Sequence, residues 1–333
     1  MEEGGYSILI TDATIVTEPG NYLKGYLYVS KGKIAALGTG EVPEEYSFAT
    51  YIINGKNKIV YPGLILPLLK ASSYPSRFGG KKASSFEELY YATQMAIHDL
   101  SLSGVTAFGT VEEVVEPVVR AIVNSYSKAV VFVNADVEGW ERQLDVMLNK
   151  WQGYQDRIFT GIYTERDNPK AIEMAERESL PLISKCCGTK LVEEKRMASE
   201  RGIVRLERGD VISYGFKSTS RTVNPLNVLR TLYYLGLDPV EVMRYVTVNA
   251  SKILGLKDTG LIKVGYSADV VIFDVSQPPG WTAGRGLPEE IILTSNPRVE
   301  TLIVRGEVIA DSFEMLSIGT KDVKRARNIF GEM

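Results

Sequence analysis

Residues 59–69, IVYPGLILPLL, mark the point at which the pattern of the sequence changes. Before this stretch, short runs rich in β-branched and aromatic residues are separated by turn residues, and no helical period appears. After it, apolar runs alternate with amphipathic stretches. Such alternation favours parallel strands joined by helical crossovers, so the sequence predicts an α/β fold that begins here.

The central part of the chain carries seven predicted strands and seven predicted helices. The strands are expected at residues 59–69, 105–111, 129–135, 158–164, 180–187, 203–206 and 211–216. The helices are expected at residues 85–101, 112–125, 139–152, 169–178, 191–200, 224–235 and 239–254. Together they cover about 200 residues, the lower limit for a (β/α)8 barrel. We therefore predict a TIM-like barrel of this type, either complete or one unit short or distorted.

The two ends of the chain are rich in short strand candidates, one of them at residues 291–293. Neither end has enough strands for a stable core of its own. We predict that residues 1–58 and 261–320 pair into one composite β-sandwich domain, beside a barrel domain at 59–260. Residues 321–333 are a charged C-terminal tail, which we expect to be helical.

The composition is that of an ordinary soluble globular protein. The 333 residues are 44% hydrophobic and 24% charged, with a net charge of −3. That balance argues against a nucleic-acid partner, because phosphate binding depends on clustered Lys and Arg. The longest apolar run, 59–69, is too short to span a membrane. Two adjacent cysteines and the absence of a signal-peptide pattern predict a cytoplasmic protein.

A single histidine, His98, limits the metal chemistry of one chain. A site that needs several imidazoles cannot be built from it. His98 falls beside the apolar stripe of the helix predicted at 85–101, so we interpret it as a residue on the flank of that helix.

Several short motifs lie at both ends of the chain and at the entry to the barrel. They are Asp12-Ala13-Thr14, Tyr61-Pro62-Gly63-Leu64-Ile65, Gly104-Val105-Thr106, Val246-Thr247-Val248-Asn249-Ala250, Leu254-Gly255-Leu256, Ala268-Asp269, Phe273-Asp274 and Leu302-Ile303-Val304-Arg305-Gly306. These motifs resemble the amidohydrolase superfamily, and most closely its cytosine deaminase and chlorohydrolase-like branch, whereas the middle of the chain matches only in its rhythm.

This resemblance implies a hydrolase whose divalent metal ion activates a water against a carbon–nitrogen or carbon–halogen bond. The family holds the ion with two histidines after strand one, further histidines from strands five and six, and an aspartate from strand eight. Here the strand-one positions are Leu68 and Lys70, the strand-five position falls at Lys185 or the adjacent Ser184, and the strand-eight position is Lys217. The strand-six histidine has no counterpart. A protonated lysine cannot ligate a cation, so we predict a lost metal site and no cofactor.

Three lysines, Lys70, Lys185 and Lys217, would then converge at the carboxyl ends of the strands, where barrel sites lie. Acidic residues also follow strands there, namely Glu112, Asp136 and Glu165. Three interpretations stay open. The lysines pair with carboxylates for structural reasons, they form a pocket for a small anion, or one acts as a neutral amine in catalysis. As ligand-binding candidates we name Lys70, Lys185, Lys217, Asp136 and Glu165.

The loop RFGGKK at residues 77–82 follows the first barrel strand and is a candidate lid or phosphate clamp, although a solvated loop is the simpler interpretation. From these residues we predict an amidohydrolase-like protein that is not a metal-dependent hydrolase but either a binder of a small anionic molecule or a pseudoenzyme. The alternative is a hydrolase of non-peptide carbon–nitrogen bonds that is metal-free or uses groups not recognised in the sequence. A homo-oligomer is expected only because the family often forms one.

Overall fold

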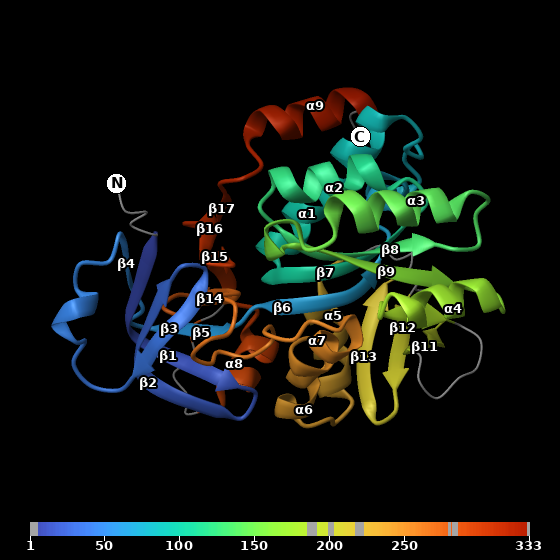
Figure 1. Cartoon of the computed structure of the whole chain (residues 1–333). Coiled ribbons are helices and arrows are strands. Elements are labelled where there is room, and N and C mark those ends of the chain that lie inside the picture. Colours follow the sequence, from blue (N-terminus) through green and yellow to red (C-terminus); the bar gives the residue numbers. More distant parts are fainter. Residues whose placement is uncertain are drawn as a thin grey trace.

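The structure is a computed structural model that describes residues 6–184, 192–198, 203–216, 223–278, 281 and 286–331. Hydrogen bonds join its strands into two sheets, one of nine strands and one of eight. The first sheet lies at one end of the molecule and the second forms its centre (Figure 1). No helix among the described residues is long and apolar enough to cross a membrane.

The eight-stranded sheet has the order β13-β12-β11-β10-β9-β8-β7-β6. Its strands are β6 (Leu64–Leu69), β7 (Val105–Glu112), β8 (Lys128–Asn134), β9 (Ile158–Thr164), β10 (Leu182–Ser184), β11 (Val192–Ala198), β12 (Ile203–Arg208) and β13 (Val211–Phe216). Neighbouring strands from β6 to β11 are parallel, whereas β12 is antiparallel to both β11 and β13. The predicted α/β class is therefore confirmed, as a curled half-barrel of mostly parallel strands.

The sheet curls until its last strand meets its first. A Cβ atom added to Gly215 of β13 would lie 2.6 Å from the Cβ of Leu68 of β6. Only a residue without a side chain allows the two backbones to approach this closely. This contact brings the carboxyl end of β13 to the carboxyl end of β6.

One strand of this sheet was predicted as a helix. The stretch at 191–200 is rich in Glu, Lys and Arg, which favour helices, yet it contains strand β11. This strand is hydrogen-bonded between β10 and β12. Because pairing on both edges outweighs local propensity, the described part of this sheet has eight strands where seven were predicted.

Helices α1, α2 and α3 lie together over one face of β7, β8 and β9 (Figure 1). The side chain of Ser85 caps α1, and that of Asn168 caps α4. The α-helices are α1 (Phe86–Leu102), α2 (Val115–Asn124), α3 (Trp140–Val146), α4 (Pro169–Arg177), α5 (Pro225–Tyr234), α6 (Pro239–Arg244), α7 (Val248–Leu254), α8 (Pro288–Ser295) and α9 (Thr320–Phe330). A 3₁₀ helix, η2 (Ala71–Phe78), directly follows β6. A single turn of 3₁₀ helix forms η1 (Glu44–Tyr46) and another forms η4 (Tyr154–Asp156), and a π-helical turn, η3 (Met147–Trp151), extends α3.

Both ends of the chain contribute to the nine-stranded sheet. Its strands are β1 (Ser7–Glu18), β2 (Asn21–Ser30), β3 (Lys33–Gly38), β4 (Tyr51–Asn54), β5 (Lys58–Pro62), β14 (Val270–Asp274), β15 (Arg298–Val304), β16 (Glu307–Asp311) and β17 (Glu314–Met315). The two ends meet where β5 pairs with β14. The sandwich of two packed sheets is not confirmed, because one set of ladders joins all these strands. The stretch at 291–293 lies in α8, not in a strand.

The predicted strand at 59–69 is divided between the two sheets. Its first half is β5 and its second half is β6, and the chain turns from one sheet to the other at Gly63. A Cβ atom there would lie 2.0 Å from the Oγ1 of Thr106, so the crossing needs glycine. A buried ion pair also links the sheets, since Lys128 Nζ of β8 lies 2.8 Å from Asp269 Oδ2 beside β14.

Candidate functional site

The carboxyl ends of β6, β7, β8, β9 and β13 surround a cavity of about 180 Å3. Such ends carry the sites of barrel enzymes. One part of the wall is apolar and the other is polar. The wall consists of Leu68, Leu69, Lys70, Val111, Asn134, Tyr163, Glu165 and Phe216.

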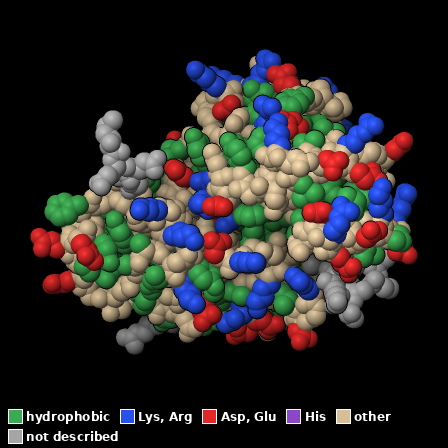
Figure 2. All heavy atoms as spheres, viewed as in Figure 1, with side chains coloured by type: hydrophobic (Ala, Val, Ile, Leu, Met, Phe, Trp, Pro, Cys, Tyr) green, Lys and Arg blue, Asp and Glu red, His purple; other side chains and the backbone are tan. Residues whose placement is uncertain are grey.

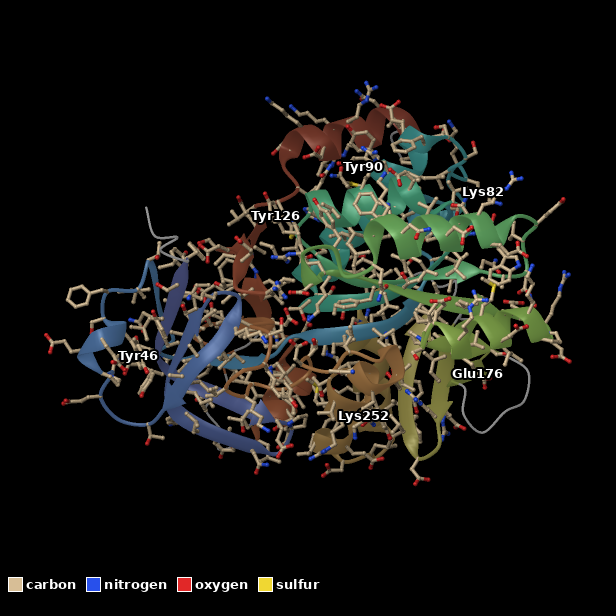
Figure 3. The ribbon with its side chains drawn as sticks, viewed as in Figure 1. Tyr46, Lys82, Tyr90, Tyr126, Glu176 and Lys252 are labelled. Carbon is tan, nitrogen blue, oxygen red and sulfur yellow. The ribbon has the colours of Figure 1, made fainter. Side chains whose placement is uncertain are left out.

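A second cavity, of about 460 Å3, adjoins the first and shares Lys70 with it. It lies between η2, the start of α1 and the turn after β7. Its polar wall consists of Lys70, Ser72, Ser73, Ser76, Lys82, Ser84, Glu112 and Glu113. Lys82 lies on the side of the molecule toward which β8 and β9 point, whereas Tyr126 lies on the opposite side (Figure 3). The two cavities therefore form one candidate site at the mouth of the half-barrel.

Lys70 is the cation at the centre of this site. Its Nζ lies 2.6 Å from Glu113 Oε1. The hydrogen bond from Lys70 holds the pKa of Glu113 below its ordinary value. A quarter of the Lys70 side chain is exposed, at 25%, so the pair faces the cavities and is not sealed in the core.

Glu112 is the buried acid of the site, with 1% of its surface exposed. Ser72 Oγ donates to Glu112 Oε2 at 2.5 Å, and Thr110 Oγ1 donates to Oε1 at 2.6 Å. Burial raises the pKa of Glu112, although the hydrogen bonds from Ser72 and Thr110 and the charge of Lys70 oppose this. Its carboxyl group is thus suited to hold and release a proton closer to neutral pH than an exposed glutamate.

A second pair of acidic residues, Glu165 and Asp136, lies at and behind the wall of the smaller cavity. Tyr163 Oη donates to Glu165 Oε1 at 2.9 Å. Asp136 accepts from the Glu165 backbone N–H at 2.6 Å and from Thr164 Oγ1 at 2.8 Å. Asp136 is absent from the lining of both described cavities, so it positions Glu165 and Thr164 from behind.

Of the five predicted residues, the structure brings Lys70 and Glu165 to one cavity and places Asp136 directly behind Glu165. Lys185 and Lys217 lie outside the described residues.

Glu113, Ser72 and Thr110 were not predicted. Two adjacent acids at the end of a strand, and two serines after Lys70, were the available signals, but they are too common in sequences to identify a site. The RFGGKK loop contributes Lys82 to the larger cavity, while Lys81 pairs with Glu88.

The described residues can be tested as ligands for the metal that the amidohydrolase resemblance implies. Among them, no three His, Cys, Asp or Glu side chains are grouped so that they could hold an ion. His98 is half-buried on α1, and burial lowers its pKa. Cys186 and Cys187 lie outside the described residues. The described donor set does not fit a metal ion, so the steps proposed below use protein groups alone.

The chain is similar to deaminases along its length. Residues 158–309 match the model of the amidohydrolase family. A 5-methylthioadenosine/S-adenosylhomocysteine deaminase from Caldicellulosiruptor saccharolyticus is 22% identical over 98% of this chain and 99% of that protein. Its counterpart from Dictyoglomus thermophilum is 21% identical over 82% of this chain and 87% of that protein.

Solved structures share the fold at lower identity. Atrazine chlorohydrolase from Arthrobacter aurescens, complexed with zinc, matches with a TM-score of 0.80 and 12% identity over 97% of this chain and 99% of that chain. An adenosine deaminase from Xanthomonas campestris with bound zinc matches with a TM-score of 0.79 and 14% identity over 96% and 97%. The prediction of a pseudoenzyme is therefore wrong, and the prediction of a lost metal site is not supported, because the relatives and structural neighbours bear the names of deaminases and hydrolases, two of them with zinc. The chain therefore resembles the amidohydrolase superfamily in its sequence and in its fold.

Proposed function

We propose that this protein hydrolyses a non-peptide carbon–nitrogen bond and releases ammonia from an amino-substituted nitrogen heterocycle of the aminopurine class. The observation that carries the proposal is the similarity to a 5-methylthioadenosine/S-adenosylhomocysteine deaminase, which extends over 98% of this chain and 99% of the relative. The two adjoining cavities at the strand ends support it, since they give such a substrate a place to bind.

The larger cavity suits the reacting part of the substrate. Its volume of about 460 Å3 falls within the usual range for small-molecule sites. Ser73 Oγ donates to the Lys70 carbonyl and Ser76 Oγ donates to the Ser73 carbonyl, both at 2.8 Å. Because each hydroxyl hydrogen is already used, these oxygens are left as acceptors. Amino and hydroxyl groups of an aminopurine nucleoside are the matching donors.

The chemistry requires groups that move protons and offset charge. An oxygen nucleophile adds to the trigonal carbon that bears the amino group, its proton is taken up, and the nitrogen leaves as ammonia after receiving a proton. Glu112 can perform both transfers. The ammonium of Lys70 lies where it offsets negative charge that develops during the addition. Glu165, oriented by Tyr163, can bind the far edge of the heterocycle in the smaller cavity.

An ammonia-release assay tests the proposal. The purified protein is incubated with adenine, adenosine, 5′-methylthioadenosine and S-adenosylhomocysteine, and ammonia is measured with a coupled dehydrogenase. We expect turnover of at least one of them and a loss of about 100-fold or more in Glu112→Gln. Glu141→Gln is the matched control, since Glu141 pairs with Lys170 on the surface. Absence of ammonia from all four compounds would overturn the proposal.

We propose in addition that the site binds a small anionic molecule. Lys70 and Lys82 line the larger cavity, and Lys185 and Lys217 follow β10 and β13 in the sequence. Lysine is a suitable point charge for phosphate or carboxylate. On the visible face of the molecule, Lys and Arg are interspersed with Asp and Glu (Figure 2). That face is therefore poorly suited to an extended polyanion, and we propose a small anion as the ligand.

The division into domains is also a proposal. We propose a β domain from 1–58 and 261–320, a TIM-like barrel domain at 59–260 and a tail at 321–333, because both chain ends share one sheet.

We further propose a cytoplasmic homo-oligomer. Light scattering of the purified protein would measure its mass against the 36.9 kDa of one chain.

A further inference from the structure

Three side chains at the larger cavity form a continuous hydrogen-bonded series. Ser72 Oγ donates to Glu112 Oε2 at 2.5 Å, and Thr110 Oγ1 donates to the other carboxylate oxygen at 2.6 Å. The backbone N–H of Ala71 donates to Thr110 Oγ1 at 3.0 Å and thereby fixes the orientation of that hydroxyl. A hydroxyl bonded to a base, whose orientation is set by a third group, is the arrangement of an activated nucleophile.

The surroundings of the carboxylate favour this interpretation. Ser72 is 3% exposed and Glu112 is 1% exposed, yet both contribute to the cavity wall. Among the residues that the structure describes, the groups that donate to Glu112 are two hydroxyls and the Ser72 backbone N–H, and the nearby cation Lys70 pairs with Glu113 instead. A buried carboxylate with no bonded cation in the described part of the chain attracts a proton strongly. Two hydroxyl protons lie within reach, those of Ser72 and Thr110, and of these two residues Ser72 is the one in the cavity wall.

We infer that Ser72 is the nucleophile of the site, with Glu112 as its base and Thr110 as the group that positions the base. This inference rests on the proposed hydrolysis of a carbon–nitrogen bond and specifies its first step. It takes a substrate in which a trigonal carbon bears the leaving amino group.

The reaction consumes water as its second substrate and proceeds in two halves. Ser72 Oγ forms a bond to the trigonal carbon while Glu112 takes the hydroxyl proton. The carbon–nitrogen bond then breaks, and Glu112 returns the proton to the departing nitrogen, which leaves as ammonia. Water next adds to the same carbon and gives a proton to Glu112. The carbon–Oγ bond breaks, and the proton returns to Ser72.

Covalent labelling tests the inference directly. The full-length protein is treated with a fluorophosphonate probe, and the modified residue is identified by mass spectrometry of its peptides. We expect one adduct, on Ser72, and a labelling rate at least 10-fold lower in Glu112→Gln. Ser125→Ala is the matched control, because Ser125 is also buried and hydrogen-bonded but lies at the end of α2. No adduct, or an adduct on another serine, would refute the inference.

Two variants separate this inference from the proposed function. Ser72→Ala should abolish ammonia release. Ser72→Cys should introduce a thiol at this position, and iodoacetamide should modify it faster when Glu112 is present than when Glu112→Gln is added. Ammonia release that persists in Ser72→Ala would disprove the nucleophile and leave the function standing. Labelling of Ser72 without ammonia release from any aminopurine would disprove the function and leave the nucleophile standing. Circular dichroism of each variant establishes that it is folded.

Discussion

The buried carboxyl group of Glu112 affects both the proposed activity and the stability of the folded protein. Its hydroxyl partners Ser72 and Thr110 stabilise the charged form, but burial acts in the opposite direction and is the larger effect on its pKa. The folded protein therefore binds a proton at Glu112 in a pH range in which the unfolded chain has released it. The group is kept at a cost to stability, as is common for functional residues.

The first prediction follows from the sign of that effect. Because the pKa of Glu112 is raised above 4.5 in the folded state, the contribution of Glu112 to the stability of the wild-type protein falls as pH rises from about 4.5 through the raised value. Glu112→Gln cannot ionise, so its free energy of unfolding should improve relative to the wild type across that interval. Urea denaturation at several pH values from 4 to 8 measures the difference. A difference that is constant, or that falls as pH rises, would contradict the direction of the pKa shift.

A second prediction concerns the lysine shared by the two cavities. If the site accepts an anion, inorganic phosphate or a small dicarboxylate should raise the melting temperature by binding the native state. Lys70→Ala should remove that increase, whereas Lys170→Ala should keep it, since Lys170 pairs with Glu141 on the surface. Scanning calorimetry with and without the anion measures the shift. An equal shift in Lys70→Ala would rule out a role for Lys70 in anion binding.

At the scale of elements, α1 carries its own start signal. Ser85 Oγ accepts from the Glu88 backbone N–H, and the Glu88 side chain accepts from the Ser85 N–H, which together form a capping box. The hydrogen bond from Lys81 and the backbone N–H groups of Ser85 and Ser84 lower the pKa of Glu88 to about 2. The stabilisation that the ionised Glu88 side chain contributes is present above its ordinary pKa of 4.5 and is lost as pH falls toward 2.

The third prediction tests that cap. Ser85→Ala should lower the free energy of unfolding by about 1 kcal/mol, because it leaves a helix N–H group without its acceptor. Ser85→Asp should retain most of the stability, since aspartate is also a good N-cap residue. Urea denaturation at neutral pH measures both variants. Equal stability of wild type and Ser85→Ala would show that the box adds nothing beyond solvation of the helix end.

How far the sequence predicted each element depended on whether its partners were local. Strands β9 and β13 were predicted at their observed bounds, 158–164 and 211–216. The start of α1 was predicted at residue 85, next to the observed start at Phe86, because its signal lies within four residues. In contrast, β11 was predicted as a helix and α8 as a strand, since pairing and packing partners distant in sequence decide both. The same limit applies to the candidate site, where Lys70 and Glu165 were predicted and line one cavity, but Ser72 and Thr110 matter only through their contacts with Glu112.

At the scale of the whole molecule, a buried polar cluster links the two sheets. Lys128, with 1% exposed surface, donates to Asp269 Oδ2 at 2.8 Å and to Thr259 Oγ1 at 2.7 Å. The other oxygen of Asp269 accepts from the Arg305 backbone N–H at 2.8 Å. One carboxylate thus contacts β8 of the half-barrel and the turn after β15 of the nine-stranded sheet. The relative position of the two sheets depends on this group as well as on the crossing at Gly63.

The last prediction removes one partner of that pair. Lys128→Met should lower the free energy of unfolding by about 3–5 kcal/mol, because it leaves Asp269 buried and charged without its cation. The double variant Lys128→Met with Asp269→Asn should recover part of the loss, since asparagine is neutral and can still accept from Arg305. Arg325→Met is the control, because its pair with Glu87 is exposed and should contribute little to stability. Urea denaturation ranks the three variants. If the single change at Lys128 costs no more than the change at Arg325, the ion pair does not hold the sheets together.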